Sequence, residues 1–322
     1  MIRSLLCGFG AYLPEIVVTN DELAKTVDTS DEWIRERSGI RQRHIAQPHE
    51  SCAFMATAAG RAALADAGMA AAEVDVIIVA TATPDQAFPA TALRVQAELG
   101  AGGFGFDLAA ACTGFVYALS VADGMIRAGQ VRTALVIGAE VYSRILNWQD
   151  RSTCVLFGDG AGAVVLRRGE GQGTGADRGV LSTHLHGDGR LGDILYVDGA
   201  VGRPDKSGRL VMHGREVFRH AVGHMSDVVR EALDAHGFTD RDIDWLVPHQ
   251  ANIRIIEGIG RKLGLPMERV VVTVDRHANT SAASVPLALA AAYADGRIKP
   301  GQLLLLEALG GGLTWGSALV RV

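Results

Sequence analysis

Cysteine is scarce in this chain of 322 residues. None of its cysteines is followed by a second one at CxxC spacing, so the sequence predicts neither a disulfide framework nor a zinc cluster. Such usage is typical of a reducing compartment, where thiols stay free for chemistry. The cysteines are Cys7, Cys52, Cys112 and Cys154. We therefore expect no bound metal.

Long hydrophobic runs are also lacking. The longest apolar stretches, such as Val76–Ala82 and Leu303–Leu306, fall far short of the roughly 20 residues that a bilayer crossing requires. The N-terminal segment MIRSLLCGFGAYLPE has neither the apolar core nor the small-residue cleavage site of a secretory signal. We expect a cytoplasmic protein without a membrane partner.

Neither sign of charge dominates. Lysine and arginine number 31 and aspartate and glutamate 36, for a net charge of −5. The absence of a basic excess argues against nucleic acid as a general partner. Hydrophobic residues at 48% and charged residues at 21% are typical of a folded globular chain. Glycine is abundant, with 39 residues, which indicates many close backbone approaches or positive φ angles.

Short apolar runs alternate with helical segments along the first half of the chain. The runs are nearly continuously apolar, as expected of strands in a sheet that is covered on both faces. Alternation of this kind predicts a layered α/β fold of about two domains. The predicted strands are Val74–Ala80, Phe104–Leu108 and Ala134–Gly138, and the predicted helices are Ala53–Ala67, Ala90–Leu99 and Thr113–Ala128.

The pattern of the first half returns in the second, about 170 residues further on. The matching pairs are Asp75–Val79 with Asp244–Val247, Ala134–Gly138 with Leu303–Glu307, and Ala118–Ser120 with Ala288–Ala290. The glycine-rich segment Gly169–Gly175 between them reads as a linker. We expect two similar halves, residues 1–172 and 173–322.

Three glycine-rich segments differ in what they predict. Gly100–Gly105 fits GxGxxG by letter, but it follows a helix and precedes a strand, the reverse of a dinucleotide-binding turn. We interpret it as a helix-to-strand turn. Gly158–Gly162 and Gly310–Gly316 lie beside strands, and each fits either a tight turn or bulge, or a loop whose N–H groups meet a ligand oxygen.

Cys112 follows a predicted strand and opens a predicted helix. The positive end of the helix dipole stabilises a thiolate, so we expect a lowered pKa for this thiol. Small residues surround it and leave room for a substrate. The alternative is a buried and inert cysteine.

Histidine and asparagine occur in two further loops that follow predicted strands. His249 and Asn252 lie in PHQAN, and His277 and Asn279 lie in RHANTSAAS, before a helix of small residues. Each alone fits a turn or a helix cap. A nucleophilic cysteine with two positioned hydrogen-bond donors, all at carboxyl ends of strands, favours acyl transfer.

Two chemistries use cysteine, histidine and asparagine together. In papain-type proteases the histidine follows the cysteine by about 130–150 residues, and here 137 residues separate Cys112 from His249. The chain lacks, however, the C-G-S-C-W-like segment near the N-terminus of those enzymes. The other chemistry is carbon–carbon bond formation on thioesters.

Four segments match that second chemistry closely: AAACTGFVYALSVAD, VPHQANIRII, DRHANTSAASVPLAL and GGGLTWGSALVR. Together they resemble β-ketoacyl-acyl-carrier-protein synthase III, the initiating condensing enzyme of type II fatty acid synthesis. The similarity covers essentially the whole chain. It implies a thiolase-like fold, in which two similar halves form a five-layered αβαβα protomer, and a homodimer.

The resemblance implies roles for the catalytic residues. Cys112 would take an acyl group from acyl-CoA, and His249 and Asn279 would hold the malonyl thioester carbonyl while CO2 leaves. The resulting carbanion would attack the acyl group and release 3-ketoacyl-acyl carrier protein. Backbone N–H groups of Cys112 and Gly311 would form an oxyanion hole. No metal or redox cofactor is implied, because loss of CO2 supplies the driving force.

The resemblance also implies binding residues. Trp33 and Arg37, on a short helix that we expect to open with a Thr29-x-x-Glu32 capping box, match positions that hold coenzyme A. The full expected sets are Thr29, Trp33, Arg37, Arg151 and Asn252 for coenzyme A and its pantetheine arm, Phe88 and Leu309 for the acyl pocket, with Phe88 reaching the partner subunit, and Arg254, Arg261 and Lys262 for the carrier protein. The alternative for the basic residues is a solvated helix face.

Two departures and two alternatives accompany this hypothesis. Leu309 stands where several relatives have phenylalanine, and Ala278 replaces a common glycine, which leaves the starter acyl group open. One alternative is a thiolase-fold acyltransferase of secondary metabolism with another acceptor. A non-catalytic partner subunit is disfavoured, because such subunits usually lack the cysteine.

Overall fold

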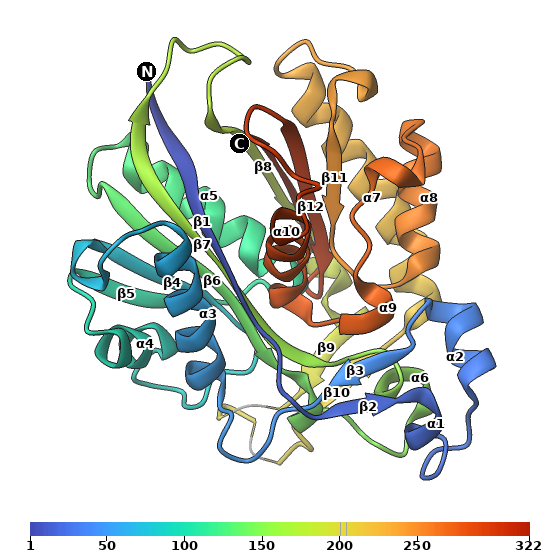
Figure 1. Cartoon of the computed structure of the whole chain (residues 1–322). Coiled ribbons are helices and arrows are strands. Elements are labelled where there is room, and N and C mark those ends of the chain that lie inside the picture. Colours follow the sequence, from blue (N-terminus) through green and yellow to red (C-terminus); the bar gives the residue numbers. More distant parts are fainter. Residues whose placement is uncertain (200, 204) are drawn as a thin grey trace.

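Two β-sheets lie face to face in the computed structural model, which describes residues 1–199, 201–203 and 205–322 (Figure 1). The first sheet has the strand order β1-β7-β6-β4-β5. Strand β4 pairs in parallel with β5 and β6, and β7 pairs antiparallel with β6 and β1. Its strands are β1 (Ile2–Tyr12), β4 (Val76–Ala80), β5 (Phe104–Leu108), β6 (Thr133–Val141) and β7 (Asp159–Glu170).

The second sheet repeats this order with one strand fewer among the described residues. Its order is β11-β12-β13-β8, with β11 parallel to β12 and β13 antiparallel to both neighbours. Its strands are β8 (Gly179–Gly187), β11 (Trp245–Pro248), β12 (Leu303–Gly310) and β13 (Thr314–Arg321). A single parallel bridge between Leu246 and Val270 stands where β5 pairs with β4 in the first sheet.

Helices form three layers around the two sheets (Figure 1). Helices α5 (Gly114–Arg127) and α10 (Ser284–Ala294) lie between the sheets, α3 (Cys52–Asp66) and α4 (Thr91–Leu99) cover the first sheet, and α7 (Gly214–Asp234) and α8 (Ile253–Leu263) lie on the outer side of the second. The result is the thiolase-like αβαβα fold with two similar halves that the sequence predicted. The division after residue 172 stays a prediction.

Alternating side chains of the buried strands supply separate cores. In β12, Leu304 and Leu306 face the core between the sheets, while Leu303 and Leu305 face the core under α7 and α8. In β4, Ile78 faces the inner core and the residues on either side of it face the core under α3. A strand covered on both faces is apolar throughout, which is why these runs were recognisable.

The shorter elements gather at the edge where the site lies. They are β2 (Val17–Thr19), α1 (Asn20–Leu23), α2 (Asp31–Ser38), β3 (Gln42–His44), α6 (Arg151–Cys154), β9 (Leu195–Asp198), β10 (Arg209–Met212) and α9 (Val274–His277). The 3-10 turns η2 (Ala111–Thr113) and η7 (Ser281–Ala283) precede α5 and α10, and η1 (Ala71–Glu73), η3 (Tyr142–Arg144), η4 (Gly189–Ile194), η5 (Asp240–Asp242) and η6 (Met267–Arg269) complete the set.

Most predicted elements are confirmed within a few residues. The turn Gly100–Gly105 does lead from α4 into β5, as predicted. Neither interpretation of Gly158–Gly162 is right, because β7 begins at Asp159 and runs through most of this segment. There, a Cβ on Gly162 would lie 2.6 Å from the backbone nitrogen of Leu287 in α10, so glycine lets helix and strand approach closely.

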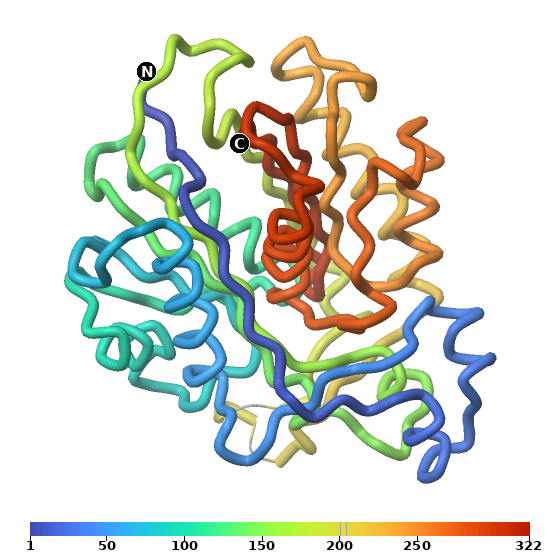
Figure 2. Tube along the Cα trace, in the orientation of Figure 1, coloured from blue at the N-terminus to red at the C-terminus, as the bar shows by residue number. Residues whose placement is uncertain are grey.

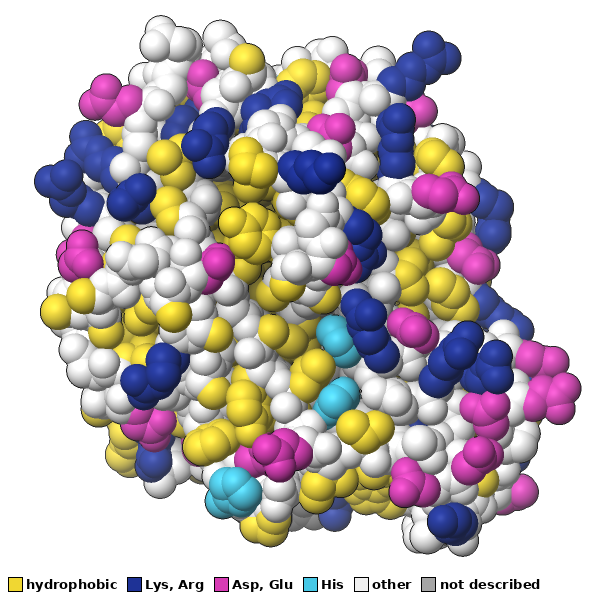
Figure 3. Space-filling model, in the orientation of Figure 1, with side chains coloured by type: hydrophobic (Ala, Val, Ile, Leu, Met, Phe, Trp, Pro, Cys, Tyr) yellow, Lys and Arg dark blue, Asp and Glu magenta, His cyan; other side chains and the backbone are white. Residues whose placement is uncertain are grey.

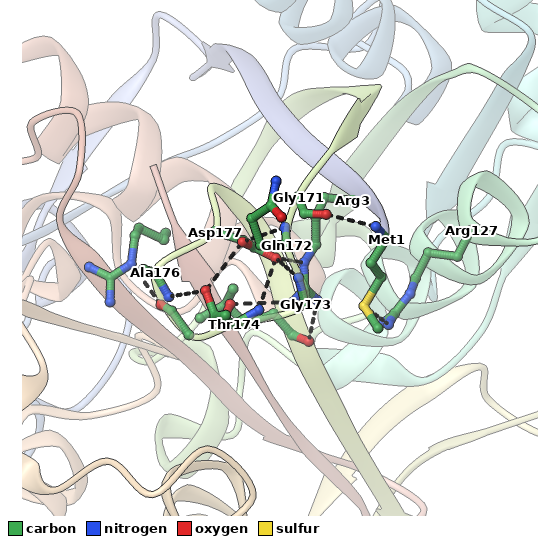
Figure 4. A network of polar contacts seen from close by, with 12 residues as sticks. Met1, Arg3, Arg127, Gly171, Gln172, Gly173, Thr174, Ala176 and Asp177 are labelled. Atoms are coloured by element: carbon green, nitrogen blue, oxygen red, sulfur yellow. Dashed lines mark hydrogen bonds and ion pairs between the residues drawn. The ribbon is translucent and has the colours of Figure 1, made fainter.

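The predicted linker is an ordered loop that fastens both chain ends (Figures 2 and 4). Strand β7 continues to Glu170, so the connection begins at residue 171. The Asp177 carboxylate accepts backbone N–H groups of this loop and Nε of Arg3, at 2.9 Å. The amino group of Met1 donates to a loop carbonyl at 2.7 Å, and Arg321 of β13 donates to another at 3.0 Å.

Candidate active site

A cavity of about 550 Å³ opens where the two halves meet. Cys112 reaches it from the first half and His249 and Asn279 from the second, so the three predicted catalytic residues line the same space. Most of the remaining lining is apolar, as is usual for a pocket that encloses an organic substrate. Leu309 and Gly311, predicted for the acyl pocket and the oxyanion hole, also line it.

Cys112 lies in turn η2, directly before α5. The preceding Ala111 has φ +45°, which is strained for a residue with a side chain and is typical of functional turns. Gly310, at the end of β12, packs against this turn: a Cβ there would lie 2.7 Å from the backbone nitrogen of Cys112. Glycine at 310 therefore leaves the space in which the Cys112 backbone sits.

The thiol of Cys112 is buried, and its expected pKa is wrong. Burial raises the pKa of Cys112 to about 12, and the nearby Glu140 carboxyl raises it as well, while the Ser281 hydroxyl lowers it. Desolvation of a charged sulfur therefore outweighs the helix dipole on which the expectation rested. At neutral pH the resting enzyme holds a thiol whose proton must leave before the sulfur can attack.

His249 follows β11 and is held as a neutral imidazole. Its Nδ1 lies 2.5 Å from Oγ of Ser284, and that oxygen accepts the backbone N–H of Gln250 at 3.3 Å. In the tautomer in which the Ser284 hydroxyl donates to Nδ1, the proton of the neutral ring is on Nε2, which is then the donor of the ring. Burial lowers the pKa of His249 to about 3, so the ring is uncharged at neutral pH.

Asn279 is fastened to the first half by its backbone. Its N–H donates to the Leu156 carbonyl at 2.9 Å, and its carbonyl accepts the Gly158 N–H at 3.0 Å. Its Oδ1 accepts the N–H of Ser281 at 2.9 Å, so the Nδ2 amide group is the part left for a substrate. Ala278, which replaces the glycine common at this position in the family, has φ +57°, a strained conformation for a residue with a side chain.

The segment before Asn279 is not the predicted strand. After the bridge at Val270, residues 271–273 belong to no helix or strand, and Val274–His277 form α9, so Asn279 follows a short helix. The Gln250 side chain shapes this segment by accepting the N–H groups of Thr273 and Val274, at 2.7 and 3.0 Å. His277, the other histidine of the motif, is buried beside His44, and burial lowers its pKa to about 3.

Three of the predicted coenzyme A residues form a cluster beside the cavity. The guanidinium groups of Arg37 and Arg151 lie 4.4 and 5.0 Å from the ring centre of Trp33. Trp33, Arg37 and Asn252 line the cavity, and Asn252 also caps α8 by accepting the Arg254 N–H at 2.8 Å. A flat aromatic surface beside two cations fits a phosphorylated heteroaromatic ligand.

The predicted capping box at Thr29 is wrong. Helix α2 begins at Asp31, and its cap is Ser30, whose Oγ accepts the N–H of Trp33 at 3.1 Å. Thr29 lies one residue too early to act as the cap. Its hydroxyl oxygen is buried without a hydrogen-bond partner among the described residues, and its role in substrate binding stays a prediction.

The basic residues of α8 lie on the surface and are partly paired. Arg261 approaches Glu257 and Lys262 approaches Asp227, each at 3.8 Å, while Nε of Arg254 donates to the Glu36 carbonyl at 3.0 Å. Basic and acidic side chains are interleaved over this part of the surface (Figure 3). Phe88 is 85% exposed in the loop after β4, so its predicted contact with a partner subunit stays a prediction.

Sequence reasoning missed the buried polar groups that support these residues. Ser284 and Ser281 are hydrogen-bonded to His249 and Asn279, Glu140 is hydrogen-bonded to Ser281, and Tyr142 lines the cavity. The serines stand in the quoted motif NTSAAS, at positions that correspond to Ala111 and Gly114 in the first half. The repeat offset applied to turn η2 would have identified them.

Two features are absent from the described residues. Within 1–199, 201–203 and 205–322, no helix combines the length and apolar character that a bilayer crossing requires. In the same part of the chain, no cluster of three or more histidine, cysteine, aspartate or glutamate side chains is arranged to hold a metal ion.

Known proteins share both the sequence and this geometry. Residues 106–189 match the family description 3-oxoacyl-acyl-carrier-protein (ACP) synthase III, and residues 233–322 match its C-terminal part. The β-ketoacyl-acyl-carrier-protein synthase III of Acidiphilium cryptum is 66% identical over 322 residues, all of both chains.

Solved structures agree over nearly the whole chain. The 3-oxoacyl-acyl-carrier-protein synthase III of Aquifex aeolicus is 47% identical with a TM-score of 0.93, covering 99% of this chain and 100% of that one. The priming β-ketosynthase of a polyketide biosynthetic pathway is 37% identical with a TM-score of 0.93, covering 99% and 96%. The chain belongs to the β-ketoacyl-acyl-carrier-protein synthase III family.

Proposed function

We propose that the cavity performs the decarboxylative condensation of an acyl-CoA starter with malonyl-acyl carrier protein, which initiates type II fatty acid synthesis. The protein is an acyltransferase of the condensing-enzyme class, as its relatives are. The observation that carries the proposal is the convergence of Cys112, His249 and Asn279 on one enclosed space. A nucleophile and two hydrogen-bond donors are the groups that this chemistry requires.

The first proposed step acylates Cys112. The sulfur attacks the thioester carbonyl of acyl-CoA, a new carbon–sulfur bond forms, and coenzyme A leaves as its thiolate. Trp33, Arg37, Arg151 and Asn252 would hold the coenzyme A part during this step, with Thr29 beside them. Backbone N–H groups of Cys112 and Gly311 would stabilise the oxyanion of the tetrahedral intermediate.

The second proposed step condenses the acyl group with a malonyl unit. Nε2–H of His249 and the Nδ2 amide of Asn279 would both donate to the malonyl thioester carbonyl, where negative charge builds up as CO2 leaves. Neutral donors suit this task, since neither gives its proton to the enolate. The carbanion then attacks acyl-Cys112. Loss of CO2 drives the reaction, so the proposed mechanism uses no metal or redox cofactor.

The proposed partners follow from the same assignment. Malonyl-acyl carrier protein, an acidic partner, would dock on α8 through Arg254, Arg261 and Lys262. We further propose a cytoplasmic homodimer. Strand β5 is an edge strand whose Phe104 is 46% exposed, and this edge and the exposed Phe88 would both meet the partner subunit. Phe88 and Leu309 would then border the acyl pocket.

The alternative acceptor of secondary metabolism is not favoured. Identity to the polyketide priming enzyme is lower than identity to the fatty acid enzymes, at 37% against 47% and 66%. The starter acyl group is the open part of the assignment. A panel of acyl-CoA chain lengths with malonyl-acyl carrier protein as acceptor would determine it.

Acyl transfer to Cys112 tests the proposed function directly. Incubation with acyl-CoA should add the mass of one acyl group to the protein, and peptide mapping should locate it on Cys112. The Cys112→Ala variant should gain none, and Cys154→Ala, which removes another buried thiol, should be acylated as the parent is. An unmodified parent protein would count against the proposal.

A further inference from the structure

Glu140 is a buried carboxyl group for which the steps above give no role. It lies at the end of β6 and has no exposed surface. Its oxygens accept hydrogen bonds from Oγ1 of Thr83 at 2.7 Å, from the N–H of Ala82 at 3.1 Å and from Oγ of Ser281 at 3.0 Å. A carboxyl group surrounded by donors is prepared to carry negative charge, although burial opposes it.

Ser281 stands between this carboxyl group and the catalytic thiol. Its hydroxyl donates to Glu140, and hydrogen bonding between the Ser281 side chain and Cys112 lowers the pKa of the thiol. Turns η2 and η7, which carry Cys112 and Ser281, pack against each other. Because the hydroxyl proton is committed to Glu140, Oγ of Ser281 can act toward the thiol only as an acceptor. The bonds therefore run in one direction, from S–H to O–H to carboxylate.

The backbone at Ser281 is arranged to place this hydroxyl. Ser281 has φ +49°, close to the +45° of Ala111 at the corresponding position of turn η2. Residues with side chains seldom adopt this region, and such strain persists where the surroundings fix it. The Ser281 N–H is also held, by Oδ1 of Asn279 at 2.9 Å.

His249 is a poor acceptor for the thiol proton. Burial lowers its pKa to about 3, and its Nδ1 is already paired with the Ser284 hydroxyl. Burial instead raises the pKa of Glu140 to about 7, against the hydrogen bonds that lower it. Of the two groups, Glu140 binds a proton far more readily at neutral pH, and it can also release one.

We infer that Ser281 and Glu140 form a proton relay that removes the thiol proton of Cys112 during acylation and returns it after condensation. The inference rests on the proposed role of Cys112 as the acylated residue. Ser281 would pass the proton between the thiol and Glu140, and Glu140 would act through Ser281 as a positioning and proton-storing residue.

The relay balances over the full reaction. In acylation the S–H bond of Cys112 breaks, its proton passes to Oγ of Ser281, and the Ser281 proton passes to Glu140. The thiolate attacks acyl-CoA, and the departing coenzyme A thiolate takes a proton from solvent. When the malonyl carbanion displaces the sulfur, the Cys112 thiolate recovers its proton from Glu140 through Ser281. One solvent proton is consumed and one CO2 released per turnover.

Other titratable groups near Glu140 stay neutral in the relevant range. Cys52 of α3, Cys112 of η2 and Tyr142 after β6 all feel the Glu140 charge. Burial raises the pKa of each of them well above neutrality. A change in acylation rate near neutral pH therefore reports on Glu140 rather than on these neighbours.

Two variants test the relay in the full-length enzyme. Glu140→Gln keeps the size and an accepting oxygen but cannot store the proton, and Ser281→Ala removes the bridge. Alanine fits that backbone, as Ala111 shows at the same φ. Each variant should slow single-turnover acylation of Cys112 by acyl-CoA about a hundredfold, the usual size of a general-base contribution. Malonyl decarboxylation should change by less than about threefold, because its donors are untouched.

The pH profile separates a relay from a purely electrostatic or structural role. Acylation by the parent enzyme should fall as pH drops through about 7, where Glu140 becomes protonated, and this acid limb should vanish in Glu140→Gln. Glu140→Asp should recover part of the rate. If Glu140 only raises the thiol pKa, Glu140→Gln will instead speed acylation and alkylation by iodoacetamide, which overturns the relay. Equal loss of acylation and decarboxylation would also overturn it.

A spectroscopic measurement on the parent enzyme tests the relay without any substitution, so it does not depend on whether a variant folds. Acylation by acyl-CoA should produce a carboxylic-acid carbonyl band in the infrared difference spectrum, as Glu140 takes up the proton. No such band on an enzyme whose Cys112 is shown by mass to be acylated would overturn the relay. Absence of the acyl adduct itself would instead count against the proposed function.

Discussion

At the active site, each half contributes the end of a central strand and the turn before a central helix. The residues at these corresponding places differ between the two halves. The end of β6 carries Glu140, which contacts turn η7 of the second half through Ser281. The end of β12 carries Gly310 at the corresponding position, and it contacts turn η2 of the first half at Cys112. The register supports this equivalence, since β6 and β12 pair in parallel with β4 and β11 at matching positions.

The difference shows how one duplicated frame produces an asymmetric site. Glycine at the end of β12 gives the nucleophile's backbone its space, and a carboxyl group at the end of β6 brings a proton acceptor to the same place. The turns before the two central helices also differ in their side chains. Turn η7 and the start of α10 carry hydroxyls, at Ser281 and Ser284, where η2 and α5 carry Ala111 and Gly114.

Among the substitutions that test this comparison, replacing Gly310 should have the largest effect on acylation. In Gly310→Ala the new Cβ meets the backbone nitrogens of Cys112 at 2.7 Å and Thr113 at 3.0 Å, and backbone atoms cannot rotate away. We expect acylation to slow at least about a hundredfold, as a displacement of roughly 1 Å at a reacting group can do. Single-turnover mass spectrometry measures this.

A second glycine on the adjoining helix supplies the control. Gly124 in α5 has open space around its Cβ position, so Gly124→Ala should leave acylation unchanged and stabilise the helix by about 0.5–1 kcal/mol. Acylation of Gly310→Ala at the parent rate would contradict the comparison, because it would show that the backbone of Cys112 does not need glycine at the end of β12.

A buried glutamate of the second sheet gives a smaller, pH-dependent effect. Glu307 in β12 is fully buried, and neither carboxyl oxygen has a hydrogen-bond partner in the described part of the chain. Burial raises its pKa to about 8, whereas an unfolded chain releases this proton near pH 4.3. Stability from this group is therefore complete below about pH 4 and is lost as pH rises to about 8.

The substitution Glu307→Gln removes this loss of stability at high pH. Relative to the parent, the variant should gain free energy of unfolding as pH rises from about 4 to about 8, by a few kcal/mol in all. Denaturant unfolding at a series of pH values measures the gain. Glu268→Gln, an exposed glutamate with the same charge change, should show a flat difference. A flat difference for Glu307→Gln as well would mean that Glu307 is ionised in the folded protein.

The fold was predictable wherever one force dominates. Strands such as β4 and β12 are buried on both faces, so their sequences are nearly continuously apolar and could be recognised as strands. Cys112 and His249 were recognisable because each follows a predicted strand inside a long family motif. The halves were visible because the repeat offset is nearly constant.

The errors at Cys112 and at Gly158–Gly162 share a physical cause, namely dependence on contacts distant in sequence. The thiol pKa depends on how completely the second half covers Cys112, which no local pattern records. Gly162 in the segment Gly158–Gly162 serves the close approach of α10, more than a hundred residues further along the chain. The cap of α2 moved by one residue, from Thr29 to Ser30, because both side chains suit that position.

The central claim is that Cys112 accepts the acyl group while His249 and Asn279 act on the malonyl unit. Measuring both partial reactions in the same preparations of His249→Ala and Asn279→Ala tests it most directly. Each variant should lose decarboxylation of malonyl-acyl carrier protein to near background and still acylate Cys112 from acyl-CoA. Decarboxylation that persists in both variants would contradict the claim.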